Sequence, residues 1–259
     1  MRRPLDQELV RRGLASDRNA AREVIASGRV RVAGRPALKD STLVRPEDAL
    51  ALGPDERRFV SRGGQKLAAA LERFDIDPAG RRCLDAGAST GGFTDCLLQA
   101  GAARVVAVDV GYGQLDWRLR NDPRVAVLER TNIRELRAEN LPYRPDLVTA
   151  DLSFISLATV LPALGELSTA EADFVLLVKP QFEAPSEAVE AGGVVRDPAI
   201  RGEAIDAVAR AGEALGLRPL AVMASPLLGP AGNAEFLLHA RRGGGSGALD
   251  VAAAVAETQ

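Results

Sequence analysis

Lysine is rare in this chain: only three of its 33 basic residues are lysines, namely Lys39, Lys66 and Lys179. Arginine stays charged in proteins, whereas a lysine can lose its proton when its surroundings shift its pKa. In a chain that uses arginine almost everywhere, a retained lysine points to a site where arginine would not serve. Two of the three, Lys66 and Lys179, lie in segments where other features also indicate chemistry.

A carboxylate and a lysine stand at the ends of two apolar runs that read as strands. Asp151 lies near the end of the run over residues 146–152, and Lys179 directly follows residues 173–178. Open α/β sheets bind their ligands at the carboxyl ends of the strands, so adjacent parallel strands would bring Asp151 and Lys179 together over one cleft. Such a pair could be a plain salt bridge, but its place at the cleft and the rarity of lysine favour a functional role.

A glycine-rich turn follows the first predicted strand of the same sheet. Residues 85–93 read Asp-Ala-Gly-Ala-Ser-Thr-Gly-Gly-Phe, and glycine at such a turn lets a ligand approach the backbone closely. The next predicted strand ends near Asp109, where a carboxylate can accept hydrogen bonds from ribose hydroxyls. The glycine spacing departs from the G-x-G-x-x-G pattern that binds a pyrophosphate. The turn therefore predicts a site for an adenosine-containing cofactor without phosphate at this position, such as S-adenosylmethionine.

Strands and helices alternate over most of the chain. The predicted strands cover residues 82–88, 104–110, 125–129, 146–152, 173–178, 217–223 and 235–240, and the main helices cover 64–74, 92–100, 155–167 and 198–215. This alternation is typical of a parallel sheet with helices on both faces. Only a turn rich in Pro and Gly separates the last two strands, so we expect them to pair antiparallel. The predicted fold class is α/β: a Rossmann-like, seven-stranded, mostly parallel sheet whose last strand is antiparallel.

The front of the chain differs from this body in pattern and in charge. Two short helices are predicted, the second over residues 17–27 with Ser16 as its cap, followed by a strand in which arginine and valine alternate over residues 29–35. Residues 1–62 hold 14 Lys and Arg against 9 Asp and Glu, whereas the remainder holds 19 against 26. A basic front end favours contact with an anion, with nucleic acid the leading candidate; a merely solvated charged face is the alternative.

We expect four segments along the chain. A small α+β domain covers residues 1–53, a linker covers 54–61, the α/β domain covers 62–242, and a flexible tail covers 243–259. The candidate phosphate contacts all lie in the first segment; they are Arg3, Arg18, Arg29, Arg31 and Arg35.

Composition argues against several other classes of protein. No stretch approaches the ~18 uninterrupted apolar residues of a membrane span, and the charged N-terminus has no apolar signal core, which points to the cytoplasm. The two cysteines, Cys83 and Cys96, and the single histidine, His239, do not form a metal-ligand spacing. We therefore expect a cytoplasmic monomer that binds neither a metal nor a membrane.

The chain resembles the TlyA (hemolysin A-like) family of ribosomal RNA 2′-O-methyltransferases. The resemblance lies in long contiguous segments, at residues 5–10, 13–18, 25–30, 60–67, 85–95, 150–156, 178–183, 192–198 and 232–236. It implies an S4 RNA-binding domain followed by an FtsJ/RrmJ-like methyltransferase domain with S-adenosylmethionine as cofactor. The implied reaction is 2′-O-methylation of ribose, on cytidine of 16S or 23S ribosomal RNA or both, with ribosomal subunits as partners.

The same resemblance implies roles for individual residues. The family's Lys-Asp-Lys-Glu tetrad corresponds to Lys66, Asp151, Lys179 and Glu235. The implied cofactor contacts are Asp85, Gly87, Ala88, Ser89, Thr90, Gly91, Gly92, Phe93, Asp109, Asn132 and Asp151. We expect Lys179 to activate the 2′-hydroxyl, and we expect Asp151 to orient Lys179. Lys66 would raise the local positive potential, and Glu235 would hold Lys66 in place.

Two other classes of function remain as alternatives. An NAD-dependent oxidoreductase could use the same sheet, but it would need a different glycine spacing and a catalytic Tyr-Lys or His group. A hemolysin-like or RNA-binding protein without catalysis is suggested by the names of relatives, although the chain has no long apolar or basic amphipathic segment suited to lysis.

Overall fold

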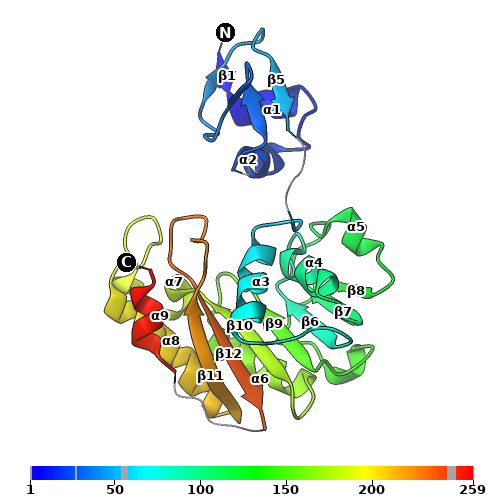
Figure 1. The fold of residues 1–259 in the computed structure, drawn as a ribbon, viewed down its shortest axis with the longest axis vertical. Coiled ribbons are helices and arrows are strands. Elements are labelled where there is room, and N and C mark those ends of the chain that lie inside the picture. The colour runs from blue at the N-terminus through cyan, green and yellow to red at the C-terminus, as the bar shows by residue number, and fades with distance from the viewer. Residues whose placement is uncertain (1, 27, 54–57, 244–248, 259) are drawn as a thin grey trace. The chain divides into compact units, whose positions relative to one another are not determined.

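A computed structural model describes residues 2–26, 28–53, 58–243 and 249–258 (Figure 1). The chain divides into two compact units, Met1–Arg57 and Arg58–Gln259. Parts of the predicted linker and tail, residues 54–57, 244–248 and 259, lie outside the described residues. The predicted domain boundaries therefore stay predictions.

The smaller unit combines two helices with short strands around a small apolar core. Its helices are α1 (Leu5–Arg11) and α2 (Arg18–Ala26), and its strands are β1 (Arg3–Pro4), β2 (Val30–Val32), β3 (Arg35–Pro36), β4 (Leu43–Val44) and β5 (Leu50–Leu52). β1 pairs with β4, and β2 lies between β3 and β5. The buried core consists of Leu5, Leu9, Ala21, Ile25, Val30, Ala37 and Val44.

Two local predictions for this unit were wrong. Asp17, and not Ser16, caps α2, because its Oδ1 accepts hydrogen bonds from the backbone N–H groups of Asn19 and Ala20, both at 2.9 Å. The predicted strand over residues 29–35 is a hairpin of β2 and β3. Its register pairs Arg35 with Val32, so Arg35 does not share a face with Arg31.

The larger unit is built on a seven-stranded sheet with the order β11-β12-β10-β9-β6-β7-β8. Its strands are β6 (Arg82–Ala86), β7 (Arg104–Val108), β8 (Val125–Leu128), β9 (Leu147–Ala150), β10 (Asp173–Val178), β11 (Leu217–Ala224) and β12 (Phe236–Arg242). β12 runs antiparallel to both of its neighbours, β10 and β11, whereas β10, β9, β6, β7 and β8 pair parallel. The α/β sheet with an antiparallel last strand is thereby confirmed.

Helices cover both faces of this sheet (Figure 1). They are α3 (Gly63–Arg73), α4 (Gly92–Gln99), α5 (Trp117–Arg120), α6 (Leu157–Leu167), α7 (Pro180–Glu183), α8 (Pro198–Glu213) and α9 (Val251–Ala256), with 3₁₀ turns at Ala138–Asn140 and Ser186–Ala188. One core joins α3, α4 and α5 to alternate strand residues, and a second core joins α6, α8 and α9 to the others. β10 lies between these cores, so all six of its residues are buried.

Part of the predicted tail, Val251–Ala256, forms a helix. This helix, α9, begins after Asp250, whose Oδ1 accepts a hydrogen bond from the Ala253 N–H at 2.9 Å. Ala254 and Val255 are buried against the core that contains α8. Small apolar residues spaced for one helix face therefore pack here, although an alanine-rich sequence alone did not show what they would pack against.

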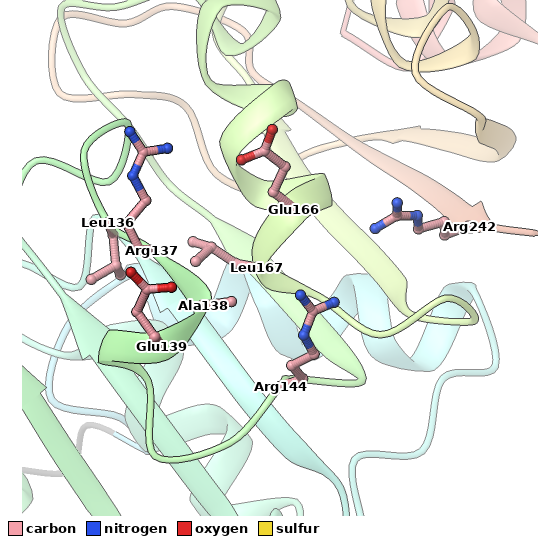
Figure 2. Close-up of a pocket in the computed structure, with 8 residues that line it drawn as sticks. All are labelled: Leu136, Arg137, Ala138, Glu139, Arg144, Glu166, Leu167 and Arg242. Atoms are coloured by element: carbon pink, nitrogen blue, oxygen red, sulfur yellow. The ribbon is translucent and has the colours of Figure 1, made fainter.

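Two arginines satisfy backbone carbonyls at the C-terminal end of α6. A hollow of about 400 Å³ lies at this end. Figure 2 shows Arg144 and Arg242 among the residues that line it. Arg144 donates to the Ser168 carbonyl at 3.2 Å, and Arg242 donates to the Gly165 carbonyl. A cation is favourable at the end of a helix, because the last carbonyls there have no partners within the helix. Arg144 and Arg242 therefore stabilise the end of α6.

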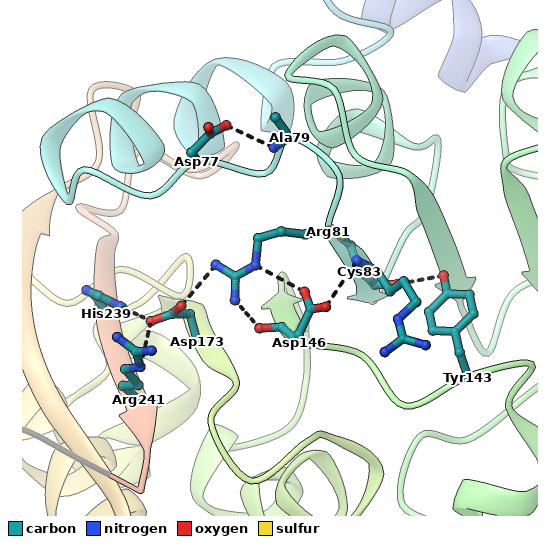
Figure 3. A network of polar contacts seen from close by, with 10 residues as sticks. Asp77, Ala79, Arg81, Cys83, Tyr143, Asp146, Asp173, His239 and Arg241 are labelled. Carbon is teal, nitrogen blue, oxygen red and sulfur yellow. Dashed lines mark hydrogen bonds and ion pairs between the residues drawn. The ribbon is translucent and has the colours of Figure 1, made fainter.

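A polar network ties together the strands at the edge of the sheet where β10 begins (Figure 3). Arg81 donates to Asp146 at 3.0 Å and to Asp173 at 2.9 Å, and His239 lies 2.9 Å from the second Asp173 oxygen. His239 is buried, and its ring stacks on Phe74. Burial by itself raises the pKa of Asp173, but the hydrogen bonds from His239 and Arg81 outweigh it and lower that pKa.

We expect Asp173→Asn to lower the free energy of unfolding by about 1–3 kcal/mol at neutral pH, because buried donors lose a charged partner. The wild-type carboxylate stabilises the fold above its unfolded pKa of 3.8, and this contribution is lost as the pH falls through the lowered folded value. The difference between the two proteins should therefore vanish in acid. Urea unfolding at several pH values measures it, with the exposed Glu139→Gln as control; a pH-independent difference would contradict the account.

Candidate active site

The four predicted tetrad residues form two ion pairs; both lysines and Glu235 are buried, and the Asp151 side chain is 24 % exposed. The Lys179 Nζ lies 2.7 Å from Asp151 Oδ1, and the Lys66 Nζ contacts Glu235 Oε2. Lys66, Lys179 and Glu235 are 7 %, 8 % and 1 % exposed. Buried charges are costly unless they are paired, and here each lysine has its own carboxylate.

The sheet register brings the two pairs to one edge. β9 ends one residue before Asp151, and β10 ends at Val178, which pairs with Phe236 at the start of β12. Lys179 and Glu235 therefore stand next to each other, one residue beyond the last pair of these two strands. The carboxyl ends of parallel strands are where open sheets bind ligands, so the site lies where the topology predicts it.

Close packing at the start of α3 places Lys66. A Cβ on Gly64 would lie 2.4 Å from side-chain atoms of Phe59, and a Cβ on Gly92 would lie 2.9 Å from the Gly64 nitrogen. The first turn of α3 thus packs directly on the first turn of α4 and on the buried Phe59 ring. Lys66 lies in that turn, and its buried side chain forms an ion pair with Glu235.

The glycine-rich loop after β6 adopts a backbone that favours glycine. Gly87, Ser89 and Gly91 have φ angles of 85°, 48° and 99°. A Cβ on Gly87 would lie 2.3 Å from the Asp151 carbonyl oxygen. The loop therefore rests directly on the backbone that carries the Asp151 carboxylate.

Asp109 holds this loop from the neighbouring strand end. Its Oδ2 accepts a hydrogen bond from the Ser89 N–H at 2.8 Å, and its Oδ1 accepts one from the Gly111 N–H at 2.6 Å. A carboxylate has about four acceptor sites, so both oxygens keep acceptor capacity for ribose hydroxyls. Asn132 lies in the next loop, where the Thr131 N–H donates to the Asp109 carbonyl at 3.0 Å.

Three predicted cofactor contacts that flank the loop in sequence are buried. Asp85 is 0 % exposed and accepts a hydrogen bond from Thr94 Oγ1 at 2.6 Å. Burial raises the pKa of Asp85 to about 7, although the Thr94 hydrogen bond opposes this shift. Gly92 and Phe93 are also buried. Asp85 and Thr94 join β6 to α4. Within the loop, Ala88 is buried as well, whereas Ser89 is exposed.

These groups fit S-adenosylmethionine. The cofactor brings ribose hydroxyls and cationic sulfonium and amino groups, and the site offers the Asp109 and Asp151 carboxylates beside a loop of exposed backbone. Residues 85–93 contain no Lys or Arg that would pair with a pyrophosphate.

Two polar residues of the site were not predicted. Lys179 Nζ donates to Ser153 Oγ at 2.9 Å. The Glu183 carboxylate accepts hydrogen bonds from Ser156 Oγ at 2.5 Å and from the Leu157 N–H at 2.7 Å. Burial raises the pKa of Glu183, although both hydrogen bonds oppose this shift. Both residues lie within segments that carried the family resemblance, which was the only available signal.

The candidate RNA-contacting arginines differ in their surroundings. Arg3, Arg31 and Arg35 are exposed. Arg29 is half-buried and donates to the Gly53 carbonyl at 3.3 Å, and Arg18 forms an ion pair with Asp6 at 2.8 Å. Asp6 thus compensates part of the charge that Arg18 could offer to a phosphate.

The part of the chain that the structure describes contains neither a membrane-spanning helix nor a metal-binding cluster. No helix there is long and apolar enough to cross a membrane. No group of three or more His, Cys, Asp and Glu side chains there is placed to hold a metal ion.

We expect Gly87→Ala to weaken S-adenosylmethionine binding by at least about tenfold, since the new Cβ must displace the Asp151 backbone as well as strain the loop. Gly80→Ala is the matched control, because Gly80 also has a positive φ (73°) but open space around the position of a Cβ. It should cost only stability, about 1–2 kcal/mol. Isothermal titration with S-adenosylmethionine decides; equal affinities for both variants would refute the proposed contact.

Comparison with known proteins identifies the family. The model of the FtsJ-like methyltransferase family matches residues 59–242, and the S4 domain model matches residues 3–50. The 16S/23S rRNA (cytidine-2′-O)-methyltransferase TlyA of Mycobacterium tuberculosis is 59% identical over 92% of this chain and 89% of its own length. Hemolysin A of Brachyspira hyodysenteriae is 36% identical over 91% and 98% of the two chains. A solved structure of a hemolysin-named protein from Streptococcus thermophilus superposes with a TM-score of 0.79 at 35% identity, covering 99% of this chain and 95% of that one. The chain therefore belongs to the TlyA family of FtsJ-like methyltransferases and uses S-adenosylmethionine as its methyl donor.

Proposed function

We propose that this enzyme methylates the ribose 2′-hydroxyl of cytidine in ribosomal RNA. The observation that carries the proposal is the Lys179–Asp151 pair, which stands beside the glycine loop at the ligand-binding edge of the sheet. The name of the Mycobacterium tuberculosis relative supports cytidine 2′-O as the target, and the S4 match supports RNA as the partner. The proposed target lies in 16S RNA, in 23S RNA or in both, as the name of that relative suggests.

Lys179 is the proposed catalytic residue. Bound S-adenosylmethionine supplies an electrophilic methyl group, so the protein must place the hydroxyl in line and handle its proton. The Lys179 Nζ accepts that proton when neutral, or stabilises the developing oxyanion when charged. Asp151, at 2.7 Å from Nζ, orients it.

Lys66 and Glu235 form the second ion pair of the proposed site. Glu235 is almost fully buried, and the missing side chain of Gly229 leaves room for it: a Cβ there would lie 2.5 Å from Glu235 Oε1. Glu235 holds the Lys66 ammonium, which raises the local positive potential and favours loss of a proton from its neighbours. Because Glu235 compensates part of this charge, Lys66 acts over a short range.

The smaller unit is proposed to bind the structured RNA. Its exposed arginines would contact phosphates, which position a protein on nucleic acid without reading sequence. The proposed organisation is an S4-like domain (1–53), a linker (54–61), the catalytic domain (62–242) and the tail (243–259). The proposed place of action is the cytoplasm, where ribosomal RNA is available, and the proposed oligomeric state is a monomer.

Hemolysis without catalysis is the second candidate, suggested by the names of the relatives from Brachyspira hyodysenteriae and Streptococcus thermophilus. The site geometry weighs against it, because a protein that only bound RNA or lysed membranes would have no use for two buried lysines, each paired with a carboxylate, at a cofactor cleft.

We expect Lys179→Arg to abolish methyl transfer while leaving S-adenosylmethionine affinity within about twofold, because arginine keeps the charge but cannot exchange a proton. Lys39→Arg, at an exposed lysine of the smaller unit, is the matched control and should stay active. Mapping 2′-O-methyl groups on ribosomal RNA from cells that make each variant identifies the target. Wild-type methylation by Lys179→Arg would contradict the catalytic role of Lys179. A methylation map that stays unchanged when the whole gene is deleted would contradict the proposed methylation of ribosomal RNA.

We expect residues 58–259 alone to bind ribosomal RNA more weakly than the full chain and with a shallower salt dependence. Removal of one arginine–phosphate pair should reduce the slope of log K against log salt by about 0.7–0.9. Binding titrations at several salt concentrations measure this, and titration with S-adenosylmethionine checks that the shorter chain is folded. An unchanged slope would mean that the smaller unit does not bind the RNA backbone.

A further inference from the structure

The Lys179 amino group has two acceptors and not one. Its Nζ lies 2.7 Å from Asp151 Oδ1 and 2.9 Å from Ser153 Oγ. The centroid of the Phe182 ring lies 5.9 Å from Nζ. A lysine nitrogen has three positions besides its bond to carbon, so these two acceptors leave one position for a substrate.

This count has the same consequence in both protonation states of Lys179. A charged amino group directs two N–H bonds to Asp151 and Ser153 and keeps one for the substrate oxygen. A neutral amino group has only two N–H bonds, and if both go to these acceptors, its lone pair occupies the third position. With Asp151 alone, two positions would remain open and the lone pair would have no defined direction.

The loop that carries Ser153 is held in a strained conformation. Phe154 has a φ of 64°, a left-handed value that is costly for a side chain of this size, and its ring is 91 % exposed. The Glu183 carboxylate clamps the next residues, since it accepts hydrogen bonds from Ser156 Oγ and from the Leu157 N–H. Glu183 lies in α7, which begins directly after Lys179. The clamp therefore joins the segment of the acceptor, Ser153, to the segment of the donor, Lys179.

We propose that Ser153 is a positioning residue that directs the free position of the Lys179 Nζ toward the ribose 2′-oxygen, with Glu183 holding the Ser153 loop in place. The proposal rests on the role proposed above for Lys179. In the transfer, the ribose 2′-oxygen forms a bond to the methyl carbon while the bond from that carbon to sulfur breaks and its electron pair stays on sulfur. The ribose O–H bond breaks, and its proton goes to the lone pair at the free position of the neutral Nζ. Ser153 changes neither the chemistry nor the methyl donor; it sets the geometry in which this proton is received.

The test uses the full-length enzyme with Ser153→Ala and Ser153→Thr, assayed on the ribosomal RNA that the methylation map identifies. Loss of the hydroxyl should lower kcat by roughly 10- to 100-fold, because a misdirected group is a poor acceptor. KM and Kd for S-adenosylmethionine should stay within about twofold. Ser153→Thr keeps a hydroxyl at the same position and should recover most of the activity.

The pH profile separates positioning from a general structural role. Ser153 accepts a hydrogen bond from the charged amino group, so its removal disfavours that form and moves the acidic limb of the kcat profile to lower pH. Ser168→Ala is the matched control. It removes a buried serine hydroxyl that donates to the Gly165 carbonyl at 3.0 Å, at the far end of α6, and should leave both kcat and the limb unchanged.

Glu183→Ala supplies an independent arm, because it releases the loop while leaving Ser153 itself intact. It should reproduce the loss of kcat with S-adenosylmethionine affinity retained, and Glu183→Gln, which keeps one acceptor oxygen, should be less impaired. Wild-type kcat in Ser153→Ala, or equal impairment of the Ala and Thr variants with an unmoved acidic limb, would overturn the proposal. An active Lys179→Arg would instead overturn the function assigned to Lys179, so the two failures are distinct.

Discussion

The antiparallel direction of β12 is the constraint on which the site depends. In a parallel sheet, only residues that follow a strand reach the ligand-binding edge. β12 reverses this rule, so the residue that precedes it, Glu235, stands at that edge beside Lys179, which follows β10. A carboxylate is thereby brought to Lys66 from a strand whose own carboxyl end lies at the opposite edge of the sheet. The hairpin of β11 and β12 is therefore part of the active site as much as of the fold.

Charge compensation explains why lysine is retained here. A buried charge without a partner is strongly destabilising, and the site holds two buried lysines, each against one carboxylate. A guanidinium would bring five donors in a rigid plane to a place with two acceptors and one substrate position, and it would keep its proton. An amino group matches the number of partners and can exchange a proton. Lys66 and Lys179 can be noticed in the sequence because the chain otherwise uses arginine. The geometry of the site explains why these two positions hold lysine.

The order and type of the elements were predictable because runs of buried residues are long and regular, as in β10, whose bounds were predicted without error. Strand ends were less predictable: β6 stops at Ala86 because Gly87 has a positive φ, whereas the apolar sequence continues to Ala88. The closeness of Lys179 to Asp151 was predictable, because both follow adjacent parallel strands. The burial of Asp85 was not predicted, since sequence cannot distinguish a carboxyl beneath a loop from one beside it. Ser153 and Glu183 were missed because their contacts depend on the left-handed backbone of Phe154, which no local pattern encodes.

The close contact between Gly87 and Asp151 couples the two tasks of the enzyme. The loop proposed to hold the methyl donor rests on the carbonyl of the residue whose carboxylate holds Lys179. A displacement of either backbone therefore moves both the donor site and the group that handles the proton. In-line transfer requires the methyl group and the hydroxyl to be aligned within a fraction of an ångström, and a shared contact maintains that alignment better than two independent loops would. This contact is possible only because Gly87 has no side chain. Gly87 therefore sets the distance between the loop proposed to hold the methyl donor and the Asp151–Lys179 pair.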